Sequence, residues 1–260
     1  MVSVKRRVRL RVAYDGTAYH GWQLQPGAVT IESELNGGLS RLLGEEIRVI
    51  GASRTDTGVH ALDNIAVFDT ASRIPAPKIA YALNQRLPQD IRIRKSEEVS
   101  ADWHPRRCAS RKTYEYRVYR GEFPMPVRRL YSLFTYRDLD VSLMRRGAGY
   151  LEGEHDFGSF CRKAACAEST VRILYRVEIL EEEEELAIRV CGNGFLYHMV
   201  RILVGTLLEV GEGKRRPEDL PALLLAKDRE KAGPTAPAHG LTLMKYEFGE
   251  TMGIVGSSNR

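Results

Sequence analysis

The sequence predicts an α/β protein of the α+β type, built from two ferredoxin-like or RNA-recognition-like halves with mainly antiparallel sheets. The first observation is the order of elements over the first hundred residues, which is β-α-β-β-α-β. This order is typical of the split βαβ unit, in which helices cover one face of an antiparallel sheet. The second observation is that a further set of strands and helices follows. We therefore expect two halves, residues 1–104 and 105–260, with a cleft between them.

Local patterns give each element of the first half. Apolar residues alternate with arginines over 7–14, the period of a strand with one buried and one basic face. A helix with leucines at helical spacing follows Thr30, a good N-cap, and ends at Gly44. We expect strands near 48–53 and 64–69, a helix through Ile79 and Leu83, and a strand at Ile91 and Ile93. The basic face of the first strand predicts a cationic sheet surface.

The second half begins after a connection that spans residues 102–111. The remaining predictions are a strand at 114–119, a helix at 140–151, strands at 171–180 and 186–191, helices at 195–210 and 217–226, and a last strand at 241–248. Five consecutive glutamates, 181–185, fall between two of these strands. An acidic run repels polyanions, so we expect a solvated hairpin loop away from the cleft.

Composition points to a protein with a sizeable core and an anionic partner. The 260 residues are 43% hydrophobic and 28% charged, with a net charge of +5 and a pI near 9.0. The four cysteines show no metal-ligand spacing, so no metal site is expected. No apolar run approaches the ~20 residues that span a bilayer. We therefore expect no membrane partner and a cytoplasmic location with reduced thiols.

Residues 51–61 are the most informative segment, because they place one carboxylate, Asp56, between glycines and close to Arg54. Strand-like runs precede and follow the segment, so Asp56 should lie on a tight connection that a ligand can approach closely. This arrangement is typical of a nucleophile loop. The alternative is a polar hairpin turn in which Asp56 caps its own backbone.

The segment is part of a longer pattern. Residues 54–61 read Arg-Thr-Asp-Thr-Gly-Val-His-Ala, and further stretches follow the order of one known family: 13–16, 19–23, 111–116, 195–201 and 233–238. Together these motifs resemble those of the TruA family of tRNA pseudouridine synthases, from about residue 8 to residue 248.

The resemblance implies an activity and a set of residue roles. It implies isomerisation of uridine to pseudouridine at positions 38, 39 and 40 in the anticodon stem-loop of tRNA, with Asp56 as nucleophile. Arg201 would pair with Asp56, Tyr114 would stack on the target base, and Arg54 would enter the space that the uridine leaves. It also implies a homodimer that holds one tRNA across both subunits, with no metal and no organic cofactor.

Residue chemistry supports two of these roles. Asp56 must be ionised to attack, yet burial disfavours a charged carboxylate unless a cation lies beside it. Arg201 lies in an apolar run where an unpaired guanidinium is costly, although a surface arginine with its head in water remains the alternative. Tyr114 and Tyr116 share one face of a strand, which is more commonly a core face; we assign Tyr114 to the base and Tyr116 to the core.

Several cations are candidates for contacts with tRNA phosphates, although each is as consistent with an ordinary solvated charge. They are Arg106, Arg107, Arg111, Lys112, Arg162 and Lys163. The histidines, including His60 and His198 inside the motifs, are interpreted as hydrogen-bonding core residues without assigned chemistry.

Two other functions compete with this reading. Asp56-Thr57-Gly58 also spells the triplet of aspartic proteases, but these need two carboxylates that share a proton, and Arg54 favours ionisation of both. The second alternative is a non-catalytic RNA-binding or RNA-chaperone module, which requires basic and aromatic surface but not Asp56. Replacement of Asp56 separates the enzyme from the binding module.

Overall fold

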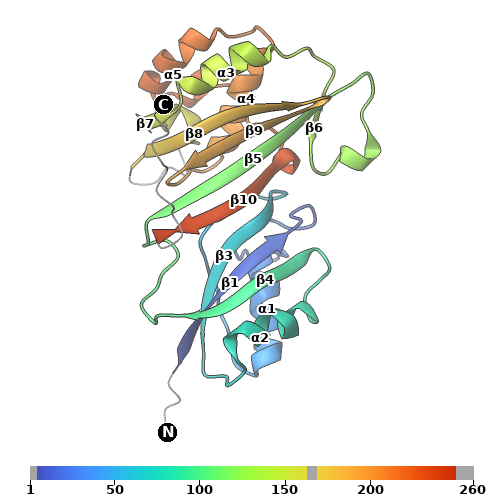
Figure 1. The fold of residues 1–260 in the computed structure, drawn as a ribbon, viewed down its shortest axis with the longest axis vertical. Coiled ribbons are helices and arrows are strands. Elements are labelled where there is room, and N and C mark those ends of the chain that lie inside the picture. Colours follow the sequence, from blue (N-terminus) through green and yellow to red (C-terminus); the bar gives the residue numbers. More distant parts are fainter. Residues whose placement is uncertain (1–4, 163–168, 250–260) are drawn as a thin grey trace, which may run out of the picture.

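The computed structural model describes residues 5–162 and 169–249, and Figure 1 shows their strands joined in one sheet. The strands are β1 (Arg6–Tyr14), β2 (Ile50–Gly51), β3 (His60–Thr70), β4 (Ile91–Val99), β5 (Ser110–Arg120), β6 (Leu133–Thr135), β7 (Gly153–Asp156), β8 (Val171–Glu182), β9 (Glu185–Gly192) and β10 (Leu241–Phe248). The α-helices are α1 (Ile31–Leu43), α2 (Ala76–Asn84), α3 (Val141–Gly149), α4 (Met199–Gly211) and α5 (Leu220–Ala226).

Both halves have the expected split βαβ topology, so the predicted fold class is confirmed. In the first half the strands lie in the order β4-β1-β3-β2, with α1 and α2 as the two crossovers. In the second half β10-β5-β9-β8 repeats this order, with α3 and α4 as crossovers. The short β6, β7 and α5 are additions to the second unit. The division at residue 104 stays a prediction.

One parallel pairing joins the two units into a continuous sheet. The free edge of β3 is shared: Ala66 and Val67 pair with β2, while His60 pairs with Thr242 and Ala61 with Leu243 of β10. β2 is only two residues long, shorter than the 48–53 strand expected from the sequence, which leaves the start of β3 open to β10. The residues that precede β3 therefore lie at the junction of the halves.

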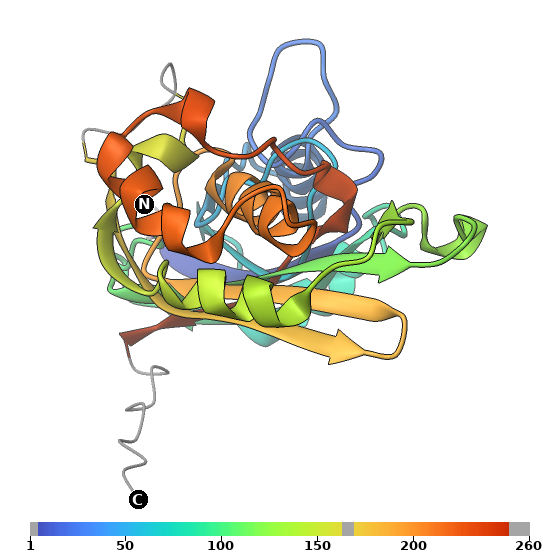
Figure 2. The same ribbon diagram turned by 90° about the horizontal axis from the view of Figure 1, so that it is seen from above.

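One main hydrophobic core unites the helices with one face of this sheet. It contains Leu10 of β1, Leu35 of α1, Leu83 of α2, Tyr116 of β5 and Leu203 of α4, all fully buried. In Figure 1 α1 and α2 lie at one end of the sheet and α3, α4 and α5 at the other. Figure 2 shows α4 on one side of the sheet. Among the described residues, no helix is long and apolar enough to cross a membrane.

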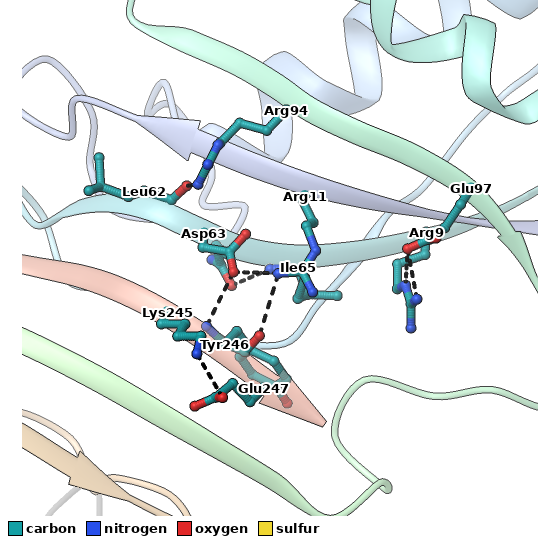
Figure 3. A network of polar contacts seen from close by, with 11 residues as sticks. Arg9, Arg11, Leu62, Asp63, Ile65, Arg94, Glu97, Lys245, Tyr246 and Glu247 are labelled. Atoms are coloured by element: carbon teal, nitrogen blue, oxygen red, sulfur yellow. Dashed lines mark hydrogen bonds and ion pairs between the residues drawn. The ribbon is translucent and has the colours of Figure 1, made fainter. Parts of the chain in front are cut away.

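The arginines of β1 do not form the cationic surface that the sequence predicts. Figure 3 shows why: carboxylates on neighbouring strands neutralise them. Arg9 pairs with Glu97 at 2.7 Å, and Arg11 pairs with Asp63 of β3. Asp63 also accepts a 3.4 Å hydrogen bond from the backbone N–H of Tyr246 in β10. These contacts connect β1, β3 and β10, so they join the two halves instead of presenting free charge to a ligand.

Helix ends follow the predicted capping with small shifts. Thr30 and Ser33 form a capping box at the start of α1, and Gly44, with φ of 70°, ends it. α4 begins at Met199, four residues later than expected, because the preceding residue is left-handed. The glutamate run forms a β8–β9 hairpin, as expected.

Candidate active site

Asp56 lies in a turn between β2 and β3, and hydrogen bonds on both sides hold this turn. The backbone N–H of Val59 donates to the Asp56 carbonyl at 3.1 Å, and Gly58 supplies the left-handed residue of the turn, with φ of 77°. The carbonyl of Thr55 accepts from the backbone N–H of Trp22 at 3.0 Å. The Thr55 hydroxyl lies 2.7 Å from the hydroxyl of Tyr14. The backbone of the loop that carries Asp56 is therefore fixed from β1 and from Trp22.

A buried amide fixes the strand that leads into the loop. Asn64 accepts from the Ser53 backbone N–H at 3.2 Å and donates to the Ser53 carbonyl at 3.0 Å. Its amide also donates to the Tyr14 hydroxyl at 3.1 Å, and the side chain is fully buried. These bonds take the place of the sheet hydrogen bonds that the short β2 lacks. No sequence pattern points to Asn64.

Arg201 reaches Asp56 across the junction of the two halves. Its Nη1 lies 3.1 Å from Oδ2 of Asp56, and its Nε donates to the Ala236 carbonyl at 2.7 Å. Each of the two charged side chains is only 15% exposed, so Arg201 is not a surface arginine with its head in water. The second hydrogen bond fixes the guanidinium independently of Asp56. A partly buried carboxylate thus has a pre-positioned cation beside it.

His198 is a second neighbour of Asp56. It precedes α4, and its Nε2 lies 3.5 Å from the same Oδ2 that Arg201 contacts. Its ring stacks on Tyr197 with a centroid distance of 3.8 Å. Burial lowers the pKa of His198, and nearby arginines add to this, against the opposite effect of Asp56. His60, the other motif histidine, is buried and bonded to backbone groups, as expected.

A cavity of about 780 Å³ opens beside Asp56. Tyr114 and Phe195 form part of its wall, with their rings edge to face at a centroid distance of 5.1 Å. Burial raises the pKa of Tyr114, and the charge of Asp56 adds to this effect, so the phenol stays protonated at neutral pH. Among the described lining residues Asp56 is the single carboxylate. This does not fit the paired carboxylates of an aspartic protease.

Cations surround the cavity. Arg54, Arg106 and Lys112 line it, as does Arg172, which the sequence analysis missed because an arginine at the start of a strand resembles any solvated charge. Burial lowers the pKa of Lys112 to about 8. Burial lowers the pKa of Arg106, and the charge of Arg54, on the same cavity, lowers it further. This end of the cavity suits an anion.

The other candidate cations that the structure describes lie away from the cavity wall. Arg107 is exposed, and Arg111 stacks over the ring of Tyr175 at 4.7 Å. Arg162 is exposed, and its charge helps to lower the pKa of His198. Lys163 falls outside the described residues. In the described ranges, no group of three or more His, Cys, Asp or Glu side chains could hold a metal ion.

Comparisons with known proteins show the family of this chain. A family model described as tRNA pseudouridine synthase matches residues 11–106 and 148–249, together more than half of the chain. The tRNA pseudouridine synthase A of Ruminiclostridium cellulolyticum is 46% identical over 244 residues, covering 94% of this chain and 100% of that protein. The tRNA pseudouridine synthase A of Brevibacillus brevis is 47% identical over 243 residues, with coverage of 94% and 100%. The predicted resemblance is confirmed, and the chain belongs to the tRNA pseudouridine synthase family.

Proposed function

We propose that this protein isomerises uridine to pseudouridine at positions 38, 39 and 40 in the anticodon stem-loop of tRNAs, with Asp56 as the nucleophile. As a pseudouridine synthase it is an isomerase. The observation that carries the residue assignment is the Asp56–Arg201 pair, 3.1 Å apart at the wall of a cavity that holds no other carboxylate among the described residues.

The reaction needs only a nucleophile, a fixed charge and room for a base to turn. A carboxylate oxygen of Asp56 forms a bond to the ribose or to the uracil ring, and the N-glycosidic bond breaks. The detached uracil rotates and its C5 bonds to C1′ of the ribose. The bond to Asp56 breaks and restores the carboxylate, C5 loses its proton to solvent, and N1, which has lost its bond to C1′, gains a proton. No atom is oxidised or reduced. The guanidinium of Arg201 lies 3.1 Å from the Asp56 carboxylate and holds it in place before attack, in a site where the bulk solvent is partly excluded.

Side chains at the cavity have complementary roles in this proposal. A base inside a stem must leave its stack before a carboxylate can reach it, at a cost of roughly a few kcal/mol. Tyr114, held edge to face by Phe195, offers a planar surface for the extruded uracil. Arg54 is exposed at the rim, two residues from Asp56, where it can occupy the vacated position.

The surrounding cations suit the tRNA backbone. Arg106, Lys112 and Arg172 line the cavity and are the first candidates for phosphate contacts, while Arg107, Arg111 and Arg162 would act outside it. Lys163 stays a candidate from the sequence alone. A homodimer would join two such surfaces, so that one tRNA lies across both subunits. We expect the protein to act in the cytoplasm.

The test uses tRNA transcripts with a single tritium-labelled uridine at 38, 39 or 40. Because C5 loses its proton only when the new C–C bond is complete, tritium release reports the isomerisation itself. We expect release from each transcript and none from transcripts labelled elsewhere in the tRNA. Release only from other positions would overturn the site assignment, and tight binding without any release would favour the RNA-binding module.

A further inference from the structure

Among the described residues, polar contacts reach only one carboxylate oxygen of Asp56. Arg201 Nη1 lies 3.1 Å from Oδ2, and His198 Nε2 lies 3.5 Å from that same atom. Within the described residues no hydrogen bond or ion pair engages Oδ1. The two oxygens of the carboxylate are therefore inequivalent: Oδ2 is held by the protein, and Oδ1 is available to a substrate.

His198 has a left-handed backbone conformation, and its side chain contacts Oδ2 of Asp56. Its φ of 61° puts it in the left-handed region, where only three described residues other than glycine lie. Histidine tolerates this region better than most side chains, but an α-helix start does not require it. The side chain makes no capping bond to α4. Its ring instead stacks on Tyr197 and directs Nε2 to Asp56. Such local strain is characteristic of functional positions.

The charges around His198 favour the neutral imidazole. The groups that act on it are the carboxylate of Asp56 and the guanidinium groups of Arg201, Arg162 and Arg229. Burial has the largest effect on its pKa and lowers it below the usual 6.5. At neutral pH the ring is thus uncharged and can donate one N–H from Nε2 when that tautomer is present. The 3.5 Å separation is long for a hydrogen bond, but such contacts often tighten when substrate binds.

We propose that His198 is a positioning residue that, as a neutral donor, holds Oδ2 of Asp56 together with Arg201 and leaves Oδ1 as the attacking oxygen. The inference rests on the proposed role of Asp56. A neutral donor orients the carboxylate without adding charge. A protonated His198 would place a second full cation on Oδ2, and this would stabilise the ionised carboxylate more than the transition state in which its charge is being lost. Protonation of His198 should therefore slow the attack.

Two substitutions at His198 distinguish the effect of its Nε2 hydrogen-bond donor from the effects of its left-handed backbone and of a positive charge on its ring. His198→Gly removes the side chain and accepts the left-handed backbone without strain, so a loss of activity cannot be attributed to conformational cost. His198→Gln retains an amide N–H at about the reach of Nε2 and cannot become charged. The measurement is the single-turnover rate of tritium release from tRNA at saturating enzyme across the acid and neutral range, with tRNA binding measured separately. Asp56→Ala serves as the inactive reference.

We expect His198→Gly to slow release by about 10-fold at neutral pH, less than the ~10²-fold or more that accompanies loss of a short bond to a reacting oxygen. tRNA affinity should stay unchanged. His198→Gln should keep most of the wild-type rate of tritium release at neutral pH. As the pH is lowered, its rate should fall at a lower pH than the rate of the wild type. The inference is overturned if His198→Gly reacts as fast as the wild type, or if the acid limb of the rate profile is the same in the Gln variant. Activity in Asp56→Ala would instead overturn the proposed nucleophile.

Discussion

The close approach of residue 21 to the nucleophile loop provides a sharp test of how that loop is positioned. Gly21 has a φ of 81°, and a Cβ added to it would lie 2.7 Å from the Thr55 carbonyl oxygen and 3.0 Å from the Asp56 carbonyl carbon. Gly27 belongs to the same connection between β1 and α1 and has a φ of 72°, but a Cβ there would meet nothing within 4 Å. Gly21→Ala and Gly27→Ala are therefore matched in backbone cost and differ in contact with the loop.

The size of the effect follows from these distances. Both substitutions carry the left-handed backbone cost of roughly 1–2 kcal/mol. In Gly21→Ala the Cβ···O contact of 2.7 Å must also open by about 0.7 Å to reach ordinary separation. That carbonyl accepts the hydrogen bond from Trp22, so the loop that carries Asp56 must move with it. Because a ~1 Å misplacement at a reacting centre costs ~10²-fold, we expect about a 10-fold lower kcat/KM for Gly21→Ala.

The assay is steady-state tritium release from tRNA, with the thermal transition of each variant as the control for folding. Gly27→Ala should lower Tm while its kcat/KM stays at the wild-type value. Gly21→Ala should show at least the same loss of stability together with the loss of activity. Equal kcat/KM values in two folded variants would refute the claim that the Gly21–Thr55 contact positions Asp56.

Two further predictions concern stability. Asn64→Ala should lower the free energy of unfolding by about 3 kcal/mol, because it leaves the buried backbone groups of Ser53 without partners; a loss below about 1 kcal/mol in urea unfolding would contradict this. For Lys112, burial lowers the folded-state pKa from 10.5 to about 8, so the folded protein binds fewer protons than the unfolded chain between these values and wild-type stability rises with pH there. Lys112→Met should be the more stable protein below pH 8 and lose that advantage as pH approaches 10.5; a pH-independent difference would show that Lys112 is not desolvated.

Much of the fold could be predicted because its signals are local. The alternation of apolar residues along β1, the Thr30 cap and the Gly44 stop each depend on neighbours in sequence, and the β-α-β-β-α-β order followed from them. The insertion of β10 beside β3 could not be predicted, because it pairs residues about 180 positions apart through only a short parallel contact. For the same reason the arginines of β1 looked like free cations: their carboxylate partners lie on β3 and β4.

The candidate site likewise contains some residues that the sequence pointed to and others that only the structure revealed. Asp56 and Arg201 were singled out by a motif and by a charge in an apolar helix, and the fold brings them together across 145 positions. Arg172 and Asn64 carry no comparable pattern, since a basic residue at a strand end and an asparagine in a strand have many ordinary roles. His198 was assigned to the core because its left-handed backbone and its distance to Asp56 are properties of the folded chain alone.

The proposed role of Asp56 as the nucleophile is tested by comparing Asp56→Asn with the wild type in single-turnover tritium release from unmodified tRNA. Asparagine keeps the size of the side chain and its place beside Arg201 but lacks the anionic oxygen. We expect release at the background level with tRNA affinity within about 3-fold of the wild type, well under the ~10-fold that 1.4 kcal/mol represents. Release by purified Asp56→Asn at a rate near that of the wild type would show that Asp56 is not the nucleophile.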